Sequence, residues 1–149
     1  MQVRAATPAD AEALASLSGQ LGYPADVPTI LRRLAQVEHG VVLVALDAKG
    51  AVCAVCAVAH AEPRHLLIAE PFVELEALVV DEAVRGAGAG AMLLAAVEAW
   101  ARERDFSSVR VRSNVLRERA QRFYQRKDYI EKKRQAVFLK RLQATNART

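Results

Sequence analysis

Apolar residues along this chain follow two periods, one typical of helices and one typical of strands. Residues 11–21 and 27–37 each carry an apolar stripe at helical spacing. Thr7 precedes the first stripe, with Pro8 beside it and Asp10 three residues later, which is close to a capping box at a helix N-terminus. The pattern therefore predicts two helices in the first quarter of the chain.

Other segments have the short apolar or alternating pattern of strands. After an opening strand at residues 2–7, residues 41–46 and 51–59 flank the turn "DAKG" and predict an antiparallel hairpin. Residues 61–71 contain two prolines and are expected to form a connecting loop. Residues 72–80 predict a strand with Glu74, Glu76, Leu78 and Val80 on one face and Val73, Leu75, Ala77 and Val79 on the other.

Three closely spaced glycines in "RGAGAG" separate this strand from a long apolar helix, in which Leu93, Val97 and Trp100 repeat at helical spacing. Beyond this helix, the pattern predicts a strand at 107–114, a helix at 117–127 and a closing strand at 136–142. The order of elements predicts a mixed α/β (α+β) sheet with helices on both faces.

Composition is consistent with one compact domain. The hydrophobic fraction of 52% suits a single core, and a chain of 149 residues is too short for two ordinary domains. We expect one domain over residues 1–149, with a frayed tail after about residue 143. The first ten residues lack the apolar segment of a signal peptide, and no apolar run is long enough to span a bilayer. We therefore expect a cytoplasmic protein without a membrane partner.

Charge is unevenly distributed along the chain. From Arg102 onward, the chain has fifteen Lys or Arg residues against five Asp or Glu residues. Such a basic segment indicates either an anionic partner or a solvated helix face. No aromatic RNA-binding strand, zinc-finger spacing or basic heptad region is present, so we expect no nucleic acid partner.

Cys53 and Cys56 form a CxxC motif, with His60 and His65 following. The surrounding "AVCAVCAVAH" has the pattern of a strand, in which residues three apart point to opposite faces. Two such thiols cannot share a metal ion. We therefore expect a buried strand and no metal.

Three chemistries use a glycine-rich loop between a strand and a helix. A P-loop requires Lys and then Ser or Thr after the last glycine, but Ala91 and Met92 follow Gly90. Gly86, Gly88 and Ala91 satisfy the dinucleotide pattern GxGxxA, but only 59 residues follow Gly90, too few for the full doubly wound sheet. The third is anion binding by the backbone N–H groups of residues 86–90 at the helix N-terminus.

This third arrangement resembles the R-x-x-G-x-G loop of the GCN5-related N-acetyltransferase (GNAT) family, with Arg85, Gly88 and Gly90 at its defined positions. "LVVDEAV" before the loop also resembles the family. The later block "SNVLRERAQRFYQRKDY" is similar to a motif of small-molecule amine acetyltransferases. The resemblance covers nearly the whole chain, because the family has the same order of elements.

The resemblance implies the GNAT fold, a central mixed and mostly antiparallel sheet of about six to seven strands. It also implies that acetyl-CoA is the cosubstrate. In the family, the strand before the loop pairs with the pantetheine arm and polarises the thioester carbonyl. The implied cofactor-binding residues are Leu78, Val79, Val80, Arg85, Gly86, Ala87, Gly88, Ala89, Gly90, Asn114, Ala120 and Tyr124.

An amine acceptor is mostly protonated at pH 7, since a lysine-like amine has a pKa of about 10.4, and an ammonium cannot attack a thioester. A general base is therefore needed, and Glu74 and Glu76 share a strand face. By resemblance, a glutamate at the position of Glu74 acts directly or through water, and Tyr124 protonates the departing thiolate. Alternatively, the glutamates belong to an exposed sheet face and Tyr124 packs with Phe123.

The chain departs from the family pattern in its last third. Arg117 occupies the place of the common asparagine, and Asn114 matches only the longer variant motif, so either residue could contact coenzyme A. Gln121 replaces the histidine of that variant. Asp128 replaces the glycine that usually forms the turn after the helix.

The acceptor is less well defined by the sequence. By resemblance, residues 19–30 and 61–71 form its walls. The two glutamates favour a cationic amine, whereas His60, Arg64 and His65 could hold an acidic group.

The leading hypothesis is transfer of acetyl to a primary amine of a small molecule, by direct attack in a ternary complex. The alternatives are a protein lysine or N-terminal acetyltransferase, a non-catalytic acyl-CoA-binding module and a basic nucleic-acid-binding domain. Homodimers are common in the family, but no residue here identifies an interface.

Overall fold

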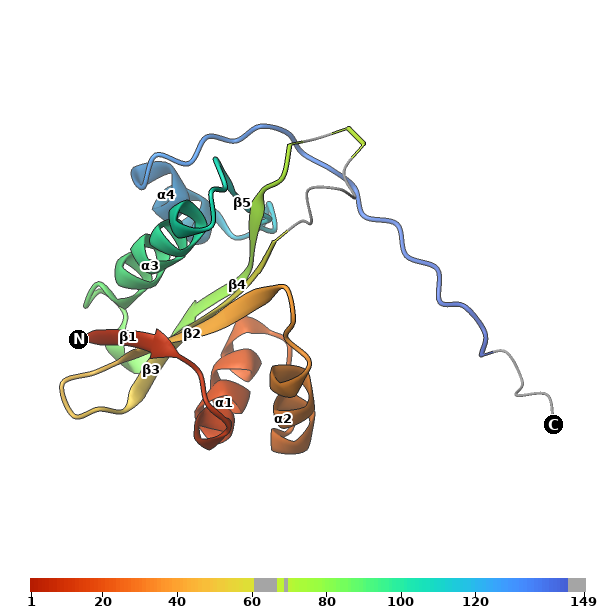
Figure 1. Ribbon diagram of the computed structural model, residues 1–149. Coiled ribbons are helices and arrows are strands. Elements are labelled where there is room, and N and C mark those ends of the chain that lie inside the picture. The colour runs from red at the N-terminus through yellow and green to blue at the C-terminus, as the bar shows by residue number, and fades with distance from the viewer. Residues whose placement is uncertain (61–66, 69, 145–149) are drawn as a thin grey trace. The chain divides into compact units, whose positions relative to one another are not determined.

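The structure, a computed structural model, describes residues 1–60, 67, 68 and 70–144. Its strands form one sheet in the order β1-β2-β3-β4-β5 (Figure 1). The strands are β1 (Gln2–Ala5), β2 (Gly40–Leu46), β3 (Val52–His60), β4 (Val73–Val80) and β5 (Val109–Val111). Pairing is antiparallel from β1 to β4 and parallel between β4 and β5. The expected mixed, mostly antiparallel sheet is confirmed, and in the described residues it has five strands in place of six or seven.

The helices follow the predicted order along the chain. They are α1 (Ala11–Leu21), α2 (Val27–Ala35), α3 (Ala89–Glu103) and α4 (Glu118–Arg126), with short 3₁₀ turns η1 (Pro8–Asp10) and η3 (Glu82–Val84). The chain divides into two compact units, Met1–Arg112 and Ser113–Thr149. The first unit contains the sheet and α1 to α3, and the second contains α4. That the whole chain is one domain stays a prediction. No helix in the described part of the chain is both long and apolar enough to cross a bilayer.

The core of the first unit lies on both faces of its sheet. Three consecutive residues of β2, Leu43, Val44 and Ala45, are buried, although successive side chains of a strand point to opposite faces. Helix α3 covers one face and α1 the other (Figure 1). Each helix contributes buried apolar residues at helical spacing, Leu14 and Leu17 from α1 and Leu93, Leu94 and Val97 from α3. The predicted helices on both faces are therefore confirmed.

The hairpin of β2 and β3 forms at the predicted turn. Asp47 accepts hydrogen bonds at its Oδ1 atom from the N–H groups of Lys49 and Ala51, at 2.8 and 3.0 Å. Gly50 adopts a left-handed φ of 82°, which glycine tolerates without a steric cost. The hydrogen bonds of Asp47 and the left-handed conformation of Gly50 therefore determine the turn between β2 and β3.

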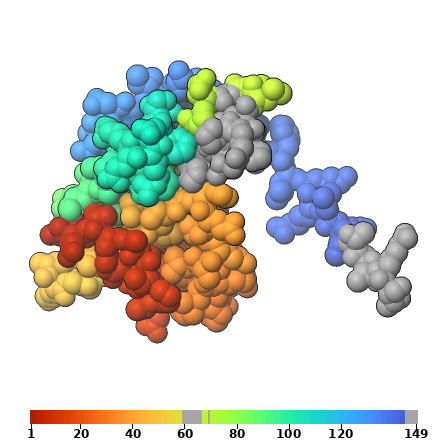
Figure 2. All heavy atoms as spheres, viewed as in Figure 1, coloured from red at the N-terminus to blue at the C-terminus, as the bar shows by residue number. Residues whose placement is uncertain are grey.

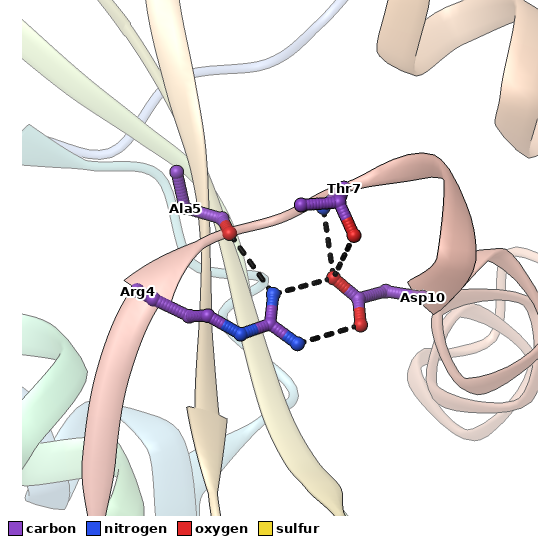
Figure 3. A network of polar contacts seen from close by, with 4 residues as sticks. All are labelled: Arg4, Ala5, Thr7 and Asp10. Atoms are coloured by element: carbon purple, nitrogen blue, oxygen red, sulfur yellow. Dashed lines mark hydrogen bonds and ion pairs between the residues drawn. The ribbon is translucent and has the colours of Figure 1, made fainter.

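A partly buried ion pair joins β1 to the start of the first helical segment (Figure 3). Asp10 is 7% exposed and accepts two hydrogen bonds from the guanidinium of Arg4, at 2.7 and 2.9 Å. Its Oδ2 atom also accepts the Thr7 backbone N–H at 2.8 Å, which is one half of the expected capping box. Hydrogen bonds from Arg4 are the main reason that the pKa of Asp10 falls from 3.8 to about 2.

Helix α2 contacts the fold less closely than α1. None of its residues is fully buried, and Asp26 caps it by accepting the Thr29 N–H at 2.8 Å. An apolar groove of about 320 Å³ runs between α2 and the adjoining strands, where Figure 2 shows the first residues (red) beside those of α2 and β2 (orange). Its lining includes Ala5, Leu31, Leu34 and Val42 and includes no residue of β4 or of the glycine loop.

The predicted closing strand at 136–142 is absent. These residues form no strand in the structure, and Val137, Phe138 and Leu139 are 81–94% exposed. A strand requires hydrogen bonds from a neighbouring strand, and an apolar pattern within one segment does not supply that neighbour. Of the tail predicted to fray, residues 145–149 lie outside the described part.

Replacing Gly19 with alanine is expected to stabilise the protein by about 0.5–1 kcal/mol, because Gly19 lies inside α1, where glycine costs backbone entropy. A Cβ atom there would meet no other atom within 4 Å. Gly22 is the matched control, since its φ of 97° opposes any side chain. Gly22→Ala is expected to destabilise by about 1–2 kcal/mol. Urea unfolding followed by circular dichroism measures both, and equal effects would contradict this account.

Candidate active site

The loop between β4 and α3 begins with a tightly bonded turn. The Asp81 N–H donates to the Cys53 carbonyl at 2.8 Å, and the Asp81 side chain accepts the Ala83 N–H at 3.0 Å. Gln20, near the end of α1, accepts the Glu82 N–H at 3.0 Å. The loop is therefore held from two sides, by β3 and by α1, before it reaches the glycines.

Two of the three glycines adopt a conformation that other residues avoid. Gly86 and Gly88 both have a φ of 90°, and Gly88 is the N-cap of α3. A Cβ atom on either glycine would meet no atom within 4 Å and would project into open space beside the loop. The glycines therefore keep the backbone accessible to an approaching ligand.

The same loop presents backbone donors at the positive end of a helix. The Met92 N–H bonds to the Gly88 carbonyl at 3.1 Å, so the intrahelical ladder begins at Met92. The N–H groups that precede it in a first turn have no intrahelical acceptor. Gly86, Ala87 and Gly88 are exposed, whereas Ala89 is buried and anchors the helix start. This arrangement suits an anion such as a pyrophosphate.

Arg85 adds a positive side chain beside these donors. Its guanidinium lies 3.9 Å from a carboxylate oxygen of Glu82, and its side chain is 39% exposed. An ion pair at this distance and exposure is weak. Arg85 can therefore turn toward a bound phosphate at little cost.

Strands β4 and β5 pair over only part of their length. Val73, Glu74 and Leu75 pair with Val109, Arg110 and Val111, and no later residue of β4 pairs with β5 in the described part. In the described residues, residues 77–80, which include Leu78, Val79 and Val80, pair only with β3 on their other side. Their backbone is therefore open to an extended ligand that would take the place of a strand.

An inserted residue marks the start of this open edge. Ala57 of β3 pairs with Ala77, and the next residue, Val58, pairs with Leu75. Glu76 is thus the extra residue of a β-bulge, and its side chain is exposed. Bulges change the direction of side chains and are common beside active sites.

Glu74 has a different environment from Glu76. Its Oε1 atom accepts a hydrogen bond from Arg110 at 3.2 Å and lies 3.0 Å from the Nε atom of Arg112 in an ion pair, and its side chain is 23% exposed. The Arg110 guanidinium also stacks over the Phe72 ring, 4.0 Å from its centroid. The structure therefore separates the two candidate bases, with one held by arginines and one exposed at the bulge.

Three further predicted site residues, Asn114, Ala120 and Tyr124, belong to the second unit, which is described by itself. The Asn114 side-chain oxygen accepts a hydrogen bond from the Leu116 N–H at 2.9 Å. The Asn114 backbone carbonyl accepts one from the Gln121 side chain at 3.0 Å. Asn114 therefore shapes the turn before α4, and Ala120 lies in the first turn of that helix.

Tyr124 is part of an aromatic cluster in this unit. Its ring makes edge contacts with Phe123 and Tyr129, at centroid distances of 5.2 and 5.8 Å. The ring contact with Phe123 is therefore present, but no residue of α4 is buried, so it is not the core packing that the sequence suggested as an alternative. Asp128, where the family has glycine, adopts a φ of 67°, and the Tyr129 N–H bonds to the Tyr124 carbonyl at 3.0 Å. The usual left-handed turn thus forms with aspartate, one of the few residues that tolerate it.

The predicted acceptor walls are described only in part. In residues 19–30, the chain turns between α1 and α2, where the Ser18 hydroxyl donates to the Tyr23 carbonyl. Residues 61–66 and 69 lie outside the described residues, and Arg64 and His65 are among them. His60 ends β3, and its side chain also lies outside the described part.

The cysteines lie in β3, as predicted. Cys53 and Cys56 are free thiols that are 3% and 0% exposed. Burial raises the pKa of the Cys56 thiol to about 12. Over the residues that the structure describes, no group of three or more His, Cys, Asp or Glu side chains could hold a metal ion.

Sequence reasoning missed three residues near the candidate site. Arg110 and Arg112 hold Glu74, and Gln20 braces the loop. The two arginines alternate with valines in "VRVR", which indicates that they share one strand face. That signal does not identify their partner, because the partner depends on the register between β4 and β5. Nothing in the sequence near Gln20 indicates its contact with the loop.

Comparisons with known proteins identify the family and the fold of this chain. Residues 12–129 match the acetyltransferase (GNAT) family. A comparison with curated proteins found no match. Among solved structures, a tetramutant of the BH1408 protein from Bacillus halodurans is similar, with a TM-score of 0.81 and 22% identity over 93% of this chain and 99% of that one.

Two aminoglycoside acetyltransferases also have a similar fold. AAC(6')-Iy in complex with CoA has a TM-score of 0.80 and 20% identity, over 95% of each chain. AAC(6')-IG from Acinetobacter haemolyticus has a TM-score of 0.80 and 18% identity, over 96% of this chain and 100% of that one. At these identities, the likeness establishes the fold. Together with the family match over most of the sequence, it shows that this chain belongs to the GNAT family of acetyltransferases and is an acyltransferase.

Proposed function

We propose that this protein transfers the acetyl group of acetyl-CoA to a primary amine of a small molecule, by direct attack in a ternary complex. The amine nitrogen bonds to the carbonyl carbon of the thioester, and the bond from that carbon to sulfur breaks. A base takes the proton that the nitrogen loses, and an acid protonates the thiolate. The products are an N-acetylated amine and free coenzyme A.

The observation that carries this proposal is the left-handed glycine pair at the N-terminus of α3, beside the open edge of β4. Pyrophosphate oxygens would accept hydrogen bonds from the backbone of residues 86–90, with Arg85 adding a positive charge. The pantetheine arm would pair with the backbone at Leu78, Val79 and Val80. The two features adjoin each other along the chain, as one extended ligand requires.

Glu76 is the better supported base. It is exposed at the bulge, at the point where β4 and β5 stop pairing, so a protonated amine can reach it. Glu74 would first have to weaken the ion pairs that its Oε1 atom forms with Arg110 and Arg112. We therefore assign proton removal to Glu76, directly or through water, and a positioning role to Glu74.

Tyr124 remains the proposed acid for the departing thiolate, and its edge contacts with two aromatic rings would restrict its orientation. Coenzyme A contacts from Asn114 and Ala120 are also proposals. The Asn114 side-chain oxygen is engaged by Leu116, so its amide NH₂ group is the part that would contact pantetheine.

Gly88→Asp is expected to abolish stabilisation by acetyl-CoA. In the unchanged protein, acetyl-CoA at 100 times its Kd should add about 2.7 kcal/mol, a rise in melting temperature of roughly 5–10 °C for a chain of this size. An aspartate at Gly88 would place a negative charge where the pyrophosphate is expected to bind. A thermal-shift titration measures the effect.

Gly50→Asp is the matched control, since Gly50 has a φ of 82° close to the 90° of Gly88 and lies in the β2–β3 turn. It should keep the full response to acetyl-CoA. If millimolar acetyl-CoA does not shift the unchanged protein, the transferase proposal fails. A shift without turnover of any amine would favour a non-catalytic acyl-CoA-binding module.

A further inference from the structure

The arginine pair beside the proposed base has no role in the transfer described above. Arg110 and Arg112 both form ion pairs with one oxygen of Glu74, so two cations share one anion. We propose that the acceptor amine carries an acidic group, a carboxylate or phosphonate, which these arginines bind while the amine lies at Glu76. This inference rests on the proposed function and specifies its acceptor.

The geometry leaves donors available on Arg112. Its Nε atom lies 3.0 Å from the Oε1 atom of Glu74 in an ion pair, and its side chain is 65% exposed. The described residues supply no other ion pair to it, so both of its terminal NH₂ groups can meet a planar or tetrahedral oxyanion.

Arg110 is more firmly positioned than Arg112. It lies between Glu74 and the Phe72 ring, and its side chain is 38% exposed. Its Nε atom is buried, and no acceptor for it is present in the described residues. The two guanidinium groups together therefore have more donors than Glu74 fills. Phe72 and Glu74 together hold Arg110 in place.

Charge at this position opposes a polycationic acceptor. Glu74 is neutralised by the arginines, and the cluster of Glu74, Arg110 and Arg112 keeps one net positive charge. Like charges in a partly buried site repel each other, so a second ammonium group next to this cluster is disfavoured. Glu76 remains as a carboxylate for the reacting amine alone.

The spacing of the two glutamates limits the size of the acceptor. Residues two apart on a strand are about 6–7 Å apart. An acceptor that places its amine at Glu76 and its acidic group beyond Glu74 thus needs only a few bonds between the two groups. Short amino acids and aminoalkylphosphonates have this form.

A charge-matched series of amines tests the inference on the full-length protein. All four amines have two carbons between the reacting amine and a second group. That group is a carboxylate in β-alanine, a phosphonate in aminoethylphosphonate, a neutral hydroxyl in ethanolamine and a second, cationic amine in ethylenediamine. We expect kcat/KM to be at least about tenfold higher for one of the acidic amines than for ethanolamine, and lowest for ethylenediamine. The better acidic amine distinguishes a carboxylate from a phosphonate site.

Arg112→Gln should remove this preference by raising KM for the acidic amine about tenfold or more, with a small change for ethanolamine. Arg112→Lys, which keeps the charge without the planar fork, should recover part of it. Arg102→Gln removes the same charge from an exposed position on α3 and should leave all of these values unchanged. A melting temperature near that of the unchanged protein shows that each variant is folded.

The outcomes separate this inference from the proposed function. If acetyl-CoA stabilises the protein but ethanolamine or ethylenediamine reacts as well as the acidic amines, the acidic-acceptor inference is overturned and the transferase remains. The acidic-acceptor inference is also overturned if acetyl-CoA binds and neither acidic amine reacts. If acetyl-CoA neither binds nor reacts, the proposed function itself fails.

Discussion

Glu76→Gln is expected to lower kcat by about 100- to 10,000-fold, the usual contribution of a general base. Glutamine has nearly the same shape but cannot take a proton from the attacking ammonium. KM for acetyl-CoA should stay nearly unchanged, because the glycine loop and the open edge of β4 keep their backbone. Steady-state release of the coenzyme A thiol, followed from pH 6 to pH 10, measures both constants.

The pH profile gives a second test of the role of Glu76. Without a base, the variant can use only acceptor that is already neutral, and that fraction rises about tenfold per pH unit below the amine pKa. The rate of Glu76→Gln should therefore rise with pH over the whole range and approach that of the unchanged enzyme. A uniform loss at every pH would contradict proton removal by Glu76.

Glu74→Gln is the matched control for this experiment. It has the same atomic change two residues away, but it weakens the hold on Arg110 and Arg112. Its main effect should be on KM for the acceptor, with a much smaller loss in kcat. If Glu74→Gln loses kcat and Glu76→Gln does not, the two roles are reversed.

The second large effect concerns stability. Asp10→Ala is expected to lower the free energy of unfolding by about 2–3 kcal/mol. The carboxylate is 7% exposed and accepts two hydrogen bonds from Arg4 and two from Thr7, through its N–H and its hydroxyl, so its removal leaves four donors without this acceptor. The value lies below that of a fully buried pair, because the Arg4 side chain is 36% exposed. Chemical unfolding at pH 7 gives the difference.

Acid titration tests the same ion pair in the unchanged protein. The pKa of Asp10 is lowered to about 2 in the folded state from an ordinary value of 3.8, chiefly by hydrogen bonds from Arg4. A lowered pKa stabilises the fold above the unfolded value, so the contribution is complete above about pH 4 and is lost as the pH falls toward 2. Its size is about 2 kcal/mol. Asp10→Ala should lose this part of the acid dependence.

Asp26→Ala provides the comparison for both measurements. Asp26 also accepts a backbone N–H at a helix start, from Thr29 at 2.8 Å, but within the described part of the chain it has no ion pair like that of Asp10 with Arg4. Its removal should cost less than that of Asp10. Equal losses from the two substitutions would mean that Arg4 contributes little.

Features set by nearby residues were predictable from the sequence. The β2–β3 turn depends on Asp47 and Gly50, which lie three positions apart, and the start of α1 depends on Thr7, Pro8 and Asp10. The glycine loop could be located for the same reason, because only glycine readily adopts the φ of 90° found at Gly86 and Gly88.

Features that depend on distant residues were not predictable. Alternation places Glu74 and Glu76 on one face, but it cannot show that a bulge at Glu76 and two arginines on β5 give them different surroundings. Arg4 likewise forms its ion pair with Asp10 only because the fold brings β1 next to the start of the first helical segment. The strand predicted at 136–142 failed for a related reason, since its pattern contained no information about a neighbouring strand.

The two buried thiols of β3 can be used to measure how often the sheet opens. Cys53 and Cys56 are 3% and 0% exposed, and burial raises the pKa of both thiols. A thiol reagent reacts with the thiolate and can reach these sulfur atoms only when the sheet separates. The rate of labelling in native buffer therefore measures how often the sheet opens. In a coenzyme A release assay, the same protection keeps the enzyme's own contribution to the thiol signal low.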